Sequence, residues 1–214
     1  MSEQALREEI VAVAQAIDKA GFCPSKSGNV SARVGDGFLI TPSGLPYART
    51  KPEDLIHLAH DGAVLSGSRK PSSEWPFHVA IYNARPDAQA IVHTHSPRAT
   101  ALSCTRRGIP AFHYMIALCG GSDVRCADYA TFGSPELAAK AVAALEGRKA
   151  VLLANHGVIA LGASLAGAHT IVAEVENLAG QYLDLLASGL EPVILDEAEM
   201  ERVSAKFAGY GKVG

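Results

Sequence analysis

The sequence has little of what several classes of protein require. Only four of its 214 residues are cysteine, and no two of them form a Cys-x-x-Cys pair. Neither a disulfide framework nor a cysteine-based zinc finger is therefore indicated, and free thiols are expected. Lysine and arginine total 19 against 22 acidic residues, which gives a net charge of −3. This balance argues against nucleic acid as a partner, because nucleic-acid binding needs clustered positive charge.

Long apolar runs are also missing from the chain. No stretch approaches the roughly 18 consecutive apolar residues that a membrane-spanning helix needs. The first residues carry the acids Glu3, Glu8 and Glu9 and lack the basic start of a secretory signal peptide. Together with the unpaired cysteines, these absences predict a cytoplasmic protein with no membrane partner.

The composition that is present favours one globular domain over residues 1–214, since 48% of the residues are hydrophobic and 19% are charged. Apolar periodicity and capping signals predict helices over 3–20, 73–83, 97–103, from 134, 164–187 and from 196. Strands are predicted over 30–34, 38–41, 90–94, 150–154 and 158–161, and a loop over 41–53. These elements predict an α/β fold, a single-domain three-layer sandwich with a mixed or mainly antiparallel sheet between helices. A mobile tail is expected at about residues 208–214.

One carboxylate and three histidines form the most informative pattern. His93 and His95 lie two residues apart at the end of a predicted strand, so their side chains are expected to point to the same side. His156 follows another apolar run and precedes a glycine. Each of these histidines alone is compatible with a solvated or core-bonded side chain. Taken together, three imidazoles and the carboxylate of Glu74 predict a zinc-type site, which other divalent transition metals also fit.

Glu74 has two interpretations. In the first turn of its predicted helix, which Ser73 is expected to cap, a carboxylate interacts favourably with the helix dipole and needs no further role. The alternative is a proton carrier that ligates the metal when the site is free of substrate and leaves it when substrate arrives. The five remaining histidines show no paired spacing and are interpreted as surface or structural residues: His57, His60, His78, His113 and His169.

Three turns of small polar residues are candidates for holding a phosphate. Each offers backbone N–H groups, hydroxyls or an amide, and the last of them lies at a predicted helix N-terminus, which favours anions. For any one of them taken alone, ordinary turn chemistry is the more common explanation. The candidate phosphate-binding residues are Gly28, Asn29, Ser43, Gly44, Ser72 and Ser73.

Five short motifs carry a resemblance to a known family. They are, in chain order, Ser27-Gly28-Asn29-Val30-Ser31, Thr41-Pro42-Ser43-Gly44, Pro71-Ser72-Ser73-Glu74, His93-Thr94-His95 and Asn155-His156-Gly157. In this order, and from about residue 5 to the tail, the chain resembles the class II aldolase/adducin family. Lys26, Asn155 and residues 96–98 depart from the pattern of the family's sugar-phosphate aldolases, which leaves the identity of the aldehyde open.

The resemblance implies a zinc enzyme that forms a homotetramer with active sites between neighbouring subunits. It implies that Glu74, His93, His95 and His156 bind the metal and that the three polar turns bind the substrate phosphate. It also implies catalytic roles for Tyr114, contributed by the neighbouring subunit, and for Tyr210 on the tail.

The implied activity is reversible aldol cleavage of a ketose 1-phosphate to dihydroxyacetone phosphate and an aldehyde. L-Fuculose 1-phosphate, or a related deoxypentulose 1-phosphate, is the expected substrate. A sugar-phosphate 4-epimerase and a sugar-acid phosphate decarboxylase of the same family are the alternatives, and Glu74 favours an aldolase because the epimerases are expected to carry Asp at that position. An adducin-like interaction module, the third alternative, is disfavoured because all four metal-binding residues are present.

Overall fold

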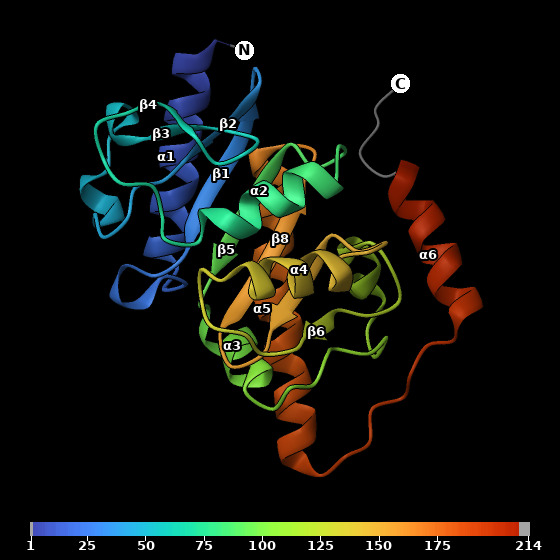
Figure 1. Cartoon of the computed structure of the whole chain (residues 1–214). Coiled ribbons are helices and arrows are strands. Elements are labelled where there is room, and N and C mark those ends of the chain that lie inside the picture. Colours follow the sequence, from blue (N-terminus) through green and yellow to red (C-terminus); the bar gives the residue numbers. More distant parts are fainter. Residues whose placement is uncertain (1, 210–214) are drawn as a thin grey trace.

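One eight-stranded sheet organises the computed structural model of the chain, which describes residues 2–209 (Figure 1). Its strands lie in the order β4-β3-β2-β1-β5-β8-β7-β6. Every neighbouring pair is antiparallel except β6 with β7, so the predicted mixed, mainly antiparallel sheet is confirmed. The strand bounds are β1 Asn29–Val34, β2 Gly37–Ile40, β3 Ile56–Ala59, β4 Val64–Ser66, β5 Ala90–Thr94, β6 Arg125–Ala127, β7 Ala150–Leu153 and β8 Gly157–Gly162.

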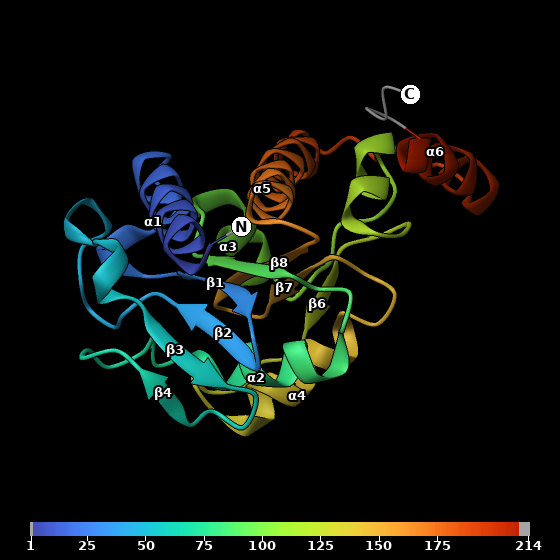
Figure 2. The same cartoon turned by 90° about the horizontal axis from the view of Figure 1, so that it is seen from above.

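Helices cover both faces of the sheet (Figure 2). One face carries α1 (Glu3–Lys19), α3 (Pro97–Ser103) and α5 (Leu165–Ser188), and the other carries α2 (Trp75–Ala84) and α4 (Pro135–Ala144). Each face has its own cluster of buried apolar side chains, because alternate residues of a strand point to opposite sides. The predicted single-domain, three-layer α/β sandwich is therefore confirmed.

The helix starts predicted at residues 134, 164 and 196 correspond to caps in the structure. Ser134 and Ser164 accept hydrogen bonds from the backbone N–H groups of Leu137 and Gly167, at 3.1 Å in both cases. Asp196 accepts one from the N–H of Glu199 at 2.7 Å, at the start of α6 (Glu197–Gly209). Such bonds satisfy N–H groups that have no partner inside the helix.

The sequence does not predict β3, β4 and β6. Burial alternates along only four residues of β3, and the three residues of β4 are all exposed. β6 is a three-residue strand at the sheet edge that pairs in parallel with β7. Strands this short acquire their conformation from a neighbouring strand, so no local period marks them.

α6 lies at one side of the molecule, reached through an extended connection after α5 (Figure 1). It packs on a short helical segment, Tyr114–Cys119, and the rings of Tyr114 and Phe207 stack with centroids 6.4 Å apart. The helix continues to Gly209, into the segment that was expected to be a mobile tail, and Tyr210 lies outside the described residues. Within residues 2–209, no helix is both long and apolar enough to cross a membrane.

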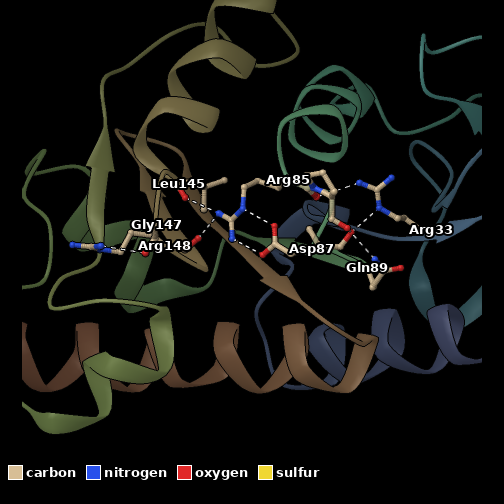
Figure 3. Close-up of polar contacts among 9 residues, drawn as sticks. Arg33, Arg85, Asp87, Gln89, Leu145, Gly147 and Arg148 are labelled. Atoms are coloured by element: carbon tan, nitrogen blue, oxygen red, sulfur yellow. Dashed lines mark hydrogen bonds and ion pairs between the residues drawn. The ribbon is translucent and has the colours of Figure 1, made fainter. Parts of the chain in front are cut away.

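The ends of α2 and α4 are joined by the guanidinium group of Arg85 (Figure 3). It donates to the backbone oxygens of Leu145 and Arg148, both at 2.7 Å, and forms a two-pronged ion pair with Asp87 at 2.8 Å. Leu145 is the C-terminal cap of α4, where carbonyl groups lack helical partners. A cation there satisfies those oxygens and interacts favourably with the negative end of the helix dipole.

Arg85→Ala is expected to lower the free energy of unfolding by about 2 kcal/mol, because hydrogen bonds from a charged donor to part-buried acceptors are lost. Urea unfolding followed by circular dichroism measures this loss. Arg202→Ala is the matched control, since Arg202 makes an exposed ion pair with Glu199 of the kind that contributes under about 1 kcal/mol. An equal loss in both variants would contradict the role assigned to Arg85.

Candidate functional site

Two of the candidate metal ligands come from the centre of the sheet. His93 lies on β5, in register with Asn29 of β1 on one side and with Ile159 of β8 on the other. His95 follows directly after the strand. Their Nε2 atoms are 3.1 Å apart, so the two side chains point to the same place, as their spacing predicts.

The third histidine lies in the tight connection between β7 and β8. Asn155, with a φ of 55°, turns the chain there, and Ser103 at the end of α3 holds the turn. The carbonyl of Ser103 accepts from the N–H of Asn155 at 3.1 Å, and its hydroxyl oxygen accepts from the N–H of His156 at 3.4 Å. A β-carbon on Gly157 would lie 2.3 Å from the carbonyl oxygen of Thr94, so only glycine lets this turn approach β5 closely.

Glu74 reaches the histidines from the start of α2. It is the N-terminal cap residue of that helix, so the prediction that Ser73 caps the helix is wrong by one residue. No side-chain cap bond forms, because the Glu74 carboxylate is directed into the protein instead. Its Oε2 lies 3.1 Å from His93 Nε2 and 3.1 Å from Asn29 Nδ2. Its Oε1 lies 3.1 Å from His156 Nε2 without forming an aligned hydrogen bond within residues 2–209.

The electrostatics of the site keep Glu74 ionised and His95 neutral. Burial would raise the pKa of the Glu74 carboxyl, but its contacts with His93 and His156 outweigh burial and hold that pKa well below its usual range. Burial, together with His93 and His156, lowers the pKa of His95 to about 3 against the opposing charge of Glu74. A carboxylate beside a neutral imidazole is the form of these groups that binds a metal ion.

These four residues fit a divalent cation. One ligand atom from each of Glu74, His93, His95 and His156 lies within 4.8 Å of all the others. His93 Nδ1 lies 2.9 Å from the carbonyl oxygen of Val158, which can only accept, so Nδ1 carries a proton and Nε2 is the nitrogen directed at the other ligands. Backbone carbonyls commonly orient metal-binding histidines in this way. Three imidazoles and one carboxylate form a donor set suited to zinc and to related metals.

A cleft of about 290 Å³ opens beside the four ligands. The second and third polar turns meet there because Ser43 N–H donates to the oxygen of Lys70, and Ser72 N–H to that of Thr41. The first turn joins them through β1, where Thr41 N–H donates to the oxygen of Val30. All six predicted phosphate-binding residues line the cleft: Gly28, Asn29, Ser43, Gly44, Ser72 and Ser73. The structure therefore brings together segments that are about 45 residues apart along the chain.

The first of these turns is suited to an anion. Gly28 has a φ of 82°, and a β-carbon there would lie 2.7 Å from the carbonyl oxygen of His93. The hydroxyl of Ser27 lines the cleft and is buried, and within residues 2–209 it has no hydrogen-bond partner. Because an unpaired buried hydroxyl is unfavourable, a phosphate oxygen is a suitable acceptor for it.

The cleft contains further residues that the motifs did not assign to the site. Lys26, with a φ of 66°, contributes a cation, and Asn155 lies next to the ligand His156. Tyr129 and Phe132, 50% and 66% exposed, add aromatic surface. Solvent-exposed aromatic side chains beside a ligand cluster are a signal of binding, but only the fold reveals that they border this cleft.

Of the two predicted catalytic tyrosines, Tyr114 is absent from the described residues that line this cleft. Tyr114 is 50% exposed and lines a different cavity, together with Met115 and Phe207 among others. Tyr210 lies outside the described residues. Of the other histidines, His78 is fully buried, so a surface position for it is wrong and the structural alternative remains.

Comparison with known proteins agrees with this geometry. A family model described as the class II aldolase and adducin N-terminal domain matches residues 8–183. The chain is 50% identical to the 5-methylthioribulose-1-phosphate/5-deoxyribulose-1-phosphate aldolase of Rhodospirillum rubrum, over 98% of this chain and 94% of the relative. It is 41% identical to the L-fuculose phosphate aldolase of Haemophilus influenzae, over 99% and 97% of the two chains.

A solved structure of an L-fuculose 1-phosphate aldolase superimposes with a TM-score of 0.93 and 41% identity, over 97% of this chain and 98% of that chain. The likeness covers both the sheet and the segments that carry the four ligands. The chain therefore belongs to the class II aldolase/adducin family, and the prediction from its sequence that it is one of the family's aldolases is confirmed.

Proposed function

We propose that this chain catalyses the reversible, zinc-dependent aldol cleavage of a ketose 1-phosphate to dihydroxyacetone phosphate and an aldehyde. The observation that carries the proposal is that Glu74, His93, His95 and His156 meet at the edge of a cleft lined by three polar turns. A metal centre and an anion site side by side suit a substrate that has a carbonyl group close to a phosphate.

Cleavage between C3 and C4 leaves negative charge on the three-carbon fragment, and a bound divalent metal acts as a Lewis acid that stabilises this charge. His93, His95 and His156 would hold the metal throughout. Glu74 would ligate it only in the absence of substrate. In the condensation direction its ionised carboxylate would take the proton from C3. In the cleavage direction it would take up a proton from solvent and deliver it to C3.

The phosphate would be held by backbone N–H groups and hydroxyls of the three turns. Ser27 and Ser72 offer hydroxyls, and Asn29 offers an amide in the same cleft. Hydrogen bonds to a phosphate are charge-assisted and roughly twice as strong as those between neutral groups. The phosphate thus positions the adjacent carbonyl next to the metal ligands.

Proton transfer at the C4 hydroxyl is assigned to Tyr114, and closure over the aldehyde to Tyr210. Because Tyr114 is absent from the residues lining the cleft of its own chain, we propose that a neighbouring subunit contributes it. This arrangement is part of a proposed homotetramer with active sites between subunits. A location in the cytoplasm stays a prediction.

For the aldehyde we favour one with an apolar end. The rings of Tyr129 and Phe132 are exposed at the cleft and offer apolar contact to the part of the sugar beyond C4. A 5-deoxy or 5-methylthio group fits such surface better than a hydroxylated one. The relative that acts on 5-substituted ribulose 1-phosphates is 50% identical, against 41% for the fuculose phosphate enzyme.

Release of dihydroxyacetone phosphate, measured by a coupled reduction, tests the proposal. 5-Deoxyribulose 1-phosphate, its 5-methylthio analogue and L-fuculose 1-phosphate are compared, with the metal-chelated protein as control. Release that chelation abolishes and zinc restores is the expected result, with the two 5-substituted pentulose phosphates preferred. Absence of release from all three by zinc-loaded protein would overturn the proposal and favour an epimerase or a decarboxylase.

Lys26→Ala is expected to raise the KM for the sugar phosphate about fivefold and to change kcat by less than twofold. Lys26 is the one lysine or arginine among the described residues that line the cleft, so its loss removes attraction for a phosphate dianion. Steady-state kinetics at low and high salt measure the effect, which should shrink as salt screens the charge. Lys19→Ala, an exposed lysine on α1, is the control, and an equal KM change in both would contradict the assignment.

A further inference from the structure

We propose that His78 is a positioning residue, which fixes the side-chain amide of Asn29 so that its N–H groups face Glu74 and the phosphate cleft. The inference rests on the proposed function and assigns a role to a histidine that binds neither metal nor substrate.

His78 is buried, and both ring stacking and hydrogen bonds fix its position. Its side chain is fully buried, and its ring stacks on Phe77 and Phe38 with centroid distances of 4.6 and 6.3 Å. Its Nε2 lies 2.5 Å from Asn29 Oδ1, and its Nδ1 lies 2.7 Å from Ser31 Oγ. Both polar atoms of the ring are therefore paired, and the ring has no freedom to turn.

The direction of the hydrogen bonds follows from the carboxylate of Glu74. A carboxylate only accepts, so the Asn29 atom that lies 3.1 Å from Glu74 Oε2 is the amide nitrogen, and the amide oxygen faces His78. That oxygen also only accepts, so His78 Nε2 carries the proton. Burial lowers the pKa of His78 to about 3, which agrees with a neutral ring that has one proton.

The other ring nitrogen, Nδ1, must then accept from the hydroxyl of Ser31. The hydroxyl of Tyr82 lies 2.8 Å from Ser31 Oγ and serves as its donor. A directed chain of hydrogen bonds therefore runs from Tyr82 through Ser31, His78 and Asn29 to Glu74. Every bond in this directed chain has one allowed donor, so the orientation of the amide is determined.

This orientation matters because an amide turns about its last side-chain bond at little cost. Asn29 lines the cleft, so a turned amide would bring its oxygen towards Glu74 and the site of the phosphate. Oxygen beside a carboxylate or a phosphate is repulsive. The N–H of His78 prevents this by binding the amide oxygen on the buried side.

Two secondary-structure elements, β1 and α2, supply all the residues of this hydrogen-bond chain. β1 contributes Asn29 and Ser31, which are two residues apart and so share a face of the sheet. α2 contributes His78 and Tyr82, which are four apart and so share a face of the helix, and Glu74 caps the same helix. Packing α2 on the sheet thereby orients the amide and the carboxylate together.

Two substitutions of His78 by amides distinguish a role in positioning Asn29 from a role in packing alone. In His78→Gln, the amide nitrogen reaches the place of Nε2 and still donates to Asn29. In His78→Asn, the shorter amide reaches only the place of Nδ1, so the contact with Ser31 remains and the donor to Asn29 is lost. A merely structural role predicts equal effects, or a larger effect for the Gln variant, which loses the Ser31 contact.

The first measurement is binding of inorganic phosphate to the zinc-loaded proteins by titration calorimetry. His78→Asn is expected to weaken binding about tenfold and His78→Gln by less than threefold. Kinetics with the substrate that the wild type cleaves should show KM raised in the Asn variant, kcat also reduced through Glu74, and both largely restored in the Gln variant. Equal losses in the two variants, or no loss in either, would overturn the proposal.

Ser31→Ala keeps the test valid if His78→Asn does not fold. Without the Ser31 hydroxyl, Nδ1 loses its partner and the His78 ring is no longer fixed at that nitrogen. The ring can then turn away from the Asn29 oxygen, so phosphate binding should weaken about threefold. Unchanged binding in a folded Ser31→Ala protein would contradict the directed chain. If wild-type protein binds phosphate but releases no dihydroxyacetone phosphate, the proposed function fails, and the phosphate titrations still decide the role of His78.

Discussion

Glu74→Gln is expected to leave zinc bound and to lower kcat by about a thousandfold. Removing a positioned proton carrier costs roughly 10²- to 10⁴-fold in rate, and an amide of the same shape neither gives nor takes a proton at neutral pH. His93, His95 and His156 remain as ligands, so metal content should stay near one ion per chain. Elemental analysis of the purified variant and steady-state release of dihydroxyacetone phosphate measure the two quantities.

Glu136→Gln is the matched control, because Glu136 is an exposed carboxylate that pairs with Lys140 on α4. It should retain both metal and turnover. Wild-type turnover in Glu74→Gln would contradict the proton-carrier role. Loss of zinc together with turnover would show that Glu74 acts mainly as a ligand, and addition of excess zinc would then restore the rate.

The histidine ligands are the part of the site that the sequence predicts best. His93 and His95 follow the two-residue period of a strand, which predicts side chains on the same side, and their Nε2 atoms lie 3.1 Å apart. His156 was recognisable from its place between an apolar run and a glycine. What brings it to the other two is the antiparallel pairing of β5 with β8, a contact between distant segments that no local pattern encodes.

For the phosphate-binding turns, too, the sequence shows each motif but not the contacts that bring the motifs together. Each turn is visible as a cluster of small polar residues, but ordinary turn chemistry is the more common explanation for each one taken alone. The hydrogen bonds between Ser43 and Lys70 and between Ser72 and Thr41 place two of them side by side. A further hydrogen bond, from Thr41 N–H to the oxygen of Val30, brings the first turn to the same cleft, and no local pattern encodes these contacts.

The hydrogen-bond chain from Tyr82 to Glu74 was not predicted from the sequence, for a different reason. His78 belongs to the apolar face of α2, between Phe77 and Ile81, so its pattern is that of a core residue. The predicted cap at Ser73 also moved Glu74 into the helix and away from its real position as the cap. Glu74, His78 and Tyr82 lie at intervals of four in either case, but no local pattern indicates that this side of the helix faces Asn29 and Ser31 of β1.

His156→Ala is expected to weaken zinc binding by at least a hundredfold and to reduce turnover to the background rate while the protein stays folded. The loss exceeds the 10- to 100-fold that follows removal of an outer hydrogen-bond partner of a metal ligand, because a ligand itself is removed. Folding should survive because the turn is held through backbone N–H groups of Asn155 and His156 bound to Ser103, which the substitution leaves in place. Zinc titration followed by thermal unfolding tests this, since an ion that binds only the folded state raises the Tm of the wild type and should no longer raise that of the variant.

The control for this variant is His169→Ala, a histidine on α5 outside the ligand group, which should bind zinc as the wild type does. In His156→Ala, added imidazole should restore part of the rise in Tm that zinc causes. The shortened side chain leaves space beside Glu74 for a free imidazole ring, which can replace the missing ligand. A full zinc response in His156→Ala without imidazole would mean that the remaining three residues suffice, and His156 would then belong to substrate binding. His156 lies in the turn between β7 and β8, whereas the other three ligands lie on or directly beside β5 and α2. Its removal should therefore disturb the sheet less than removal of His93, whose ring is fully buried.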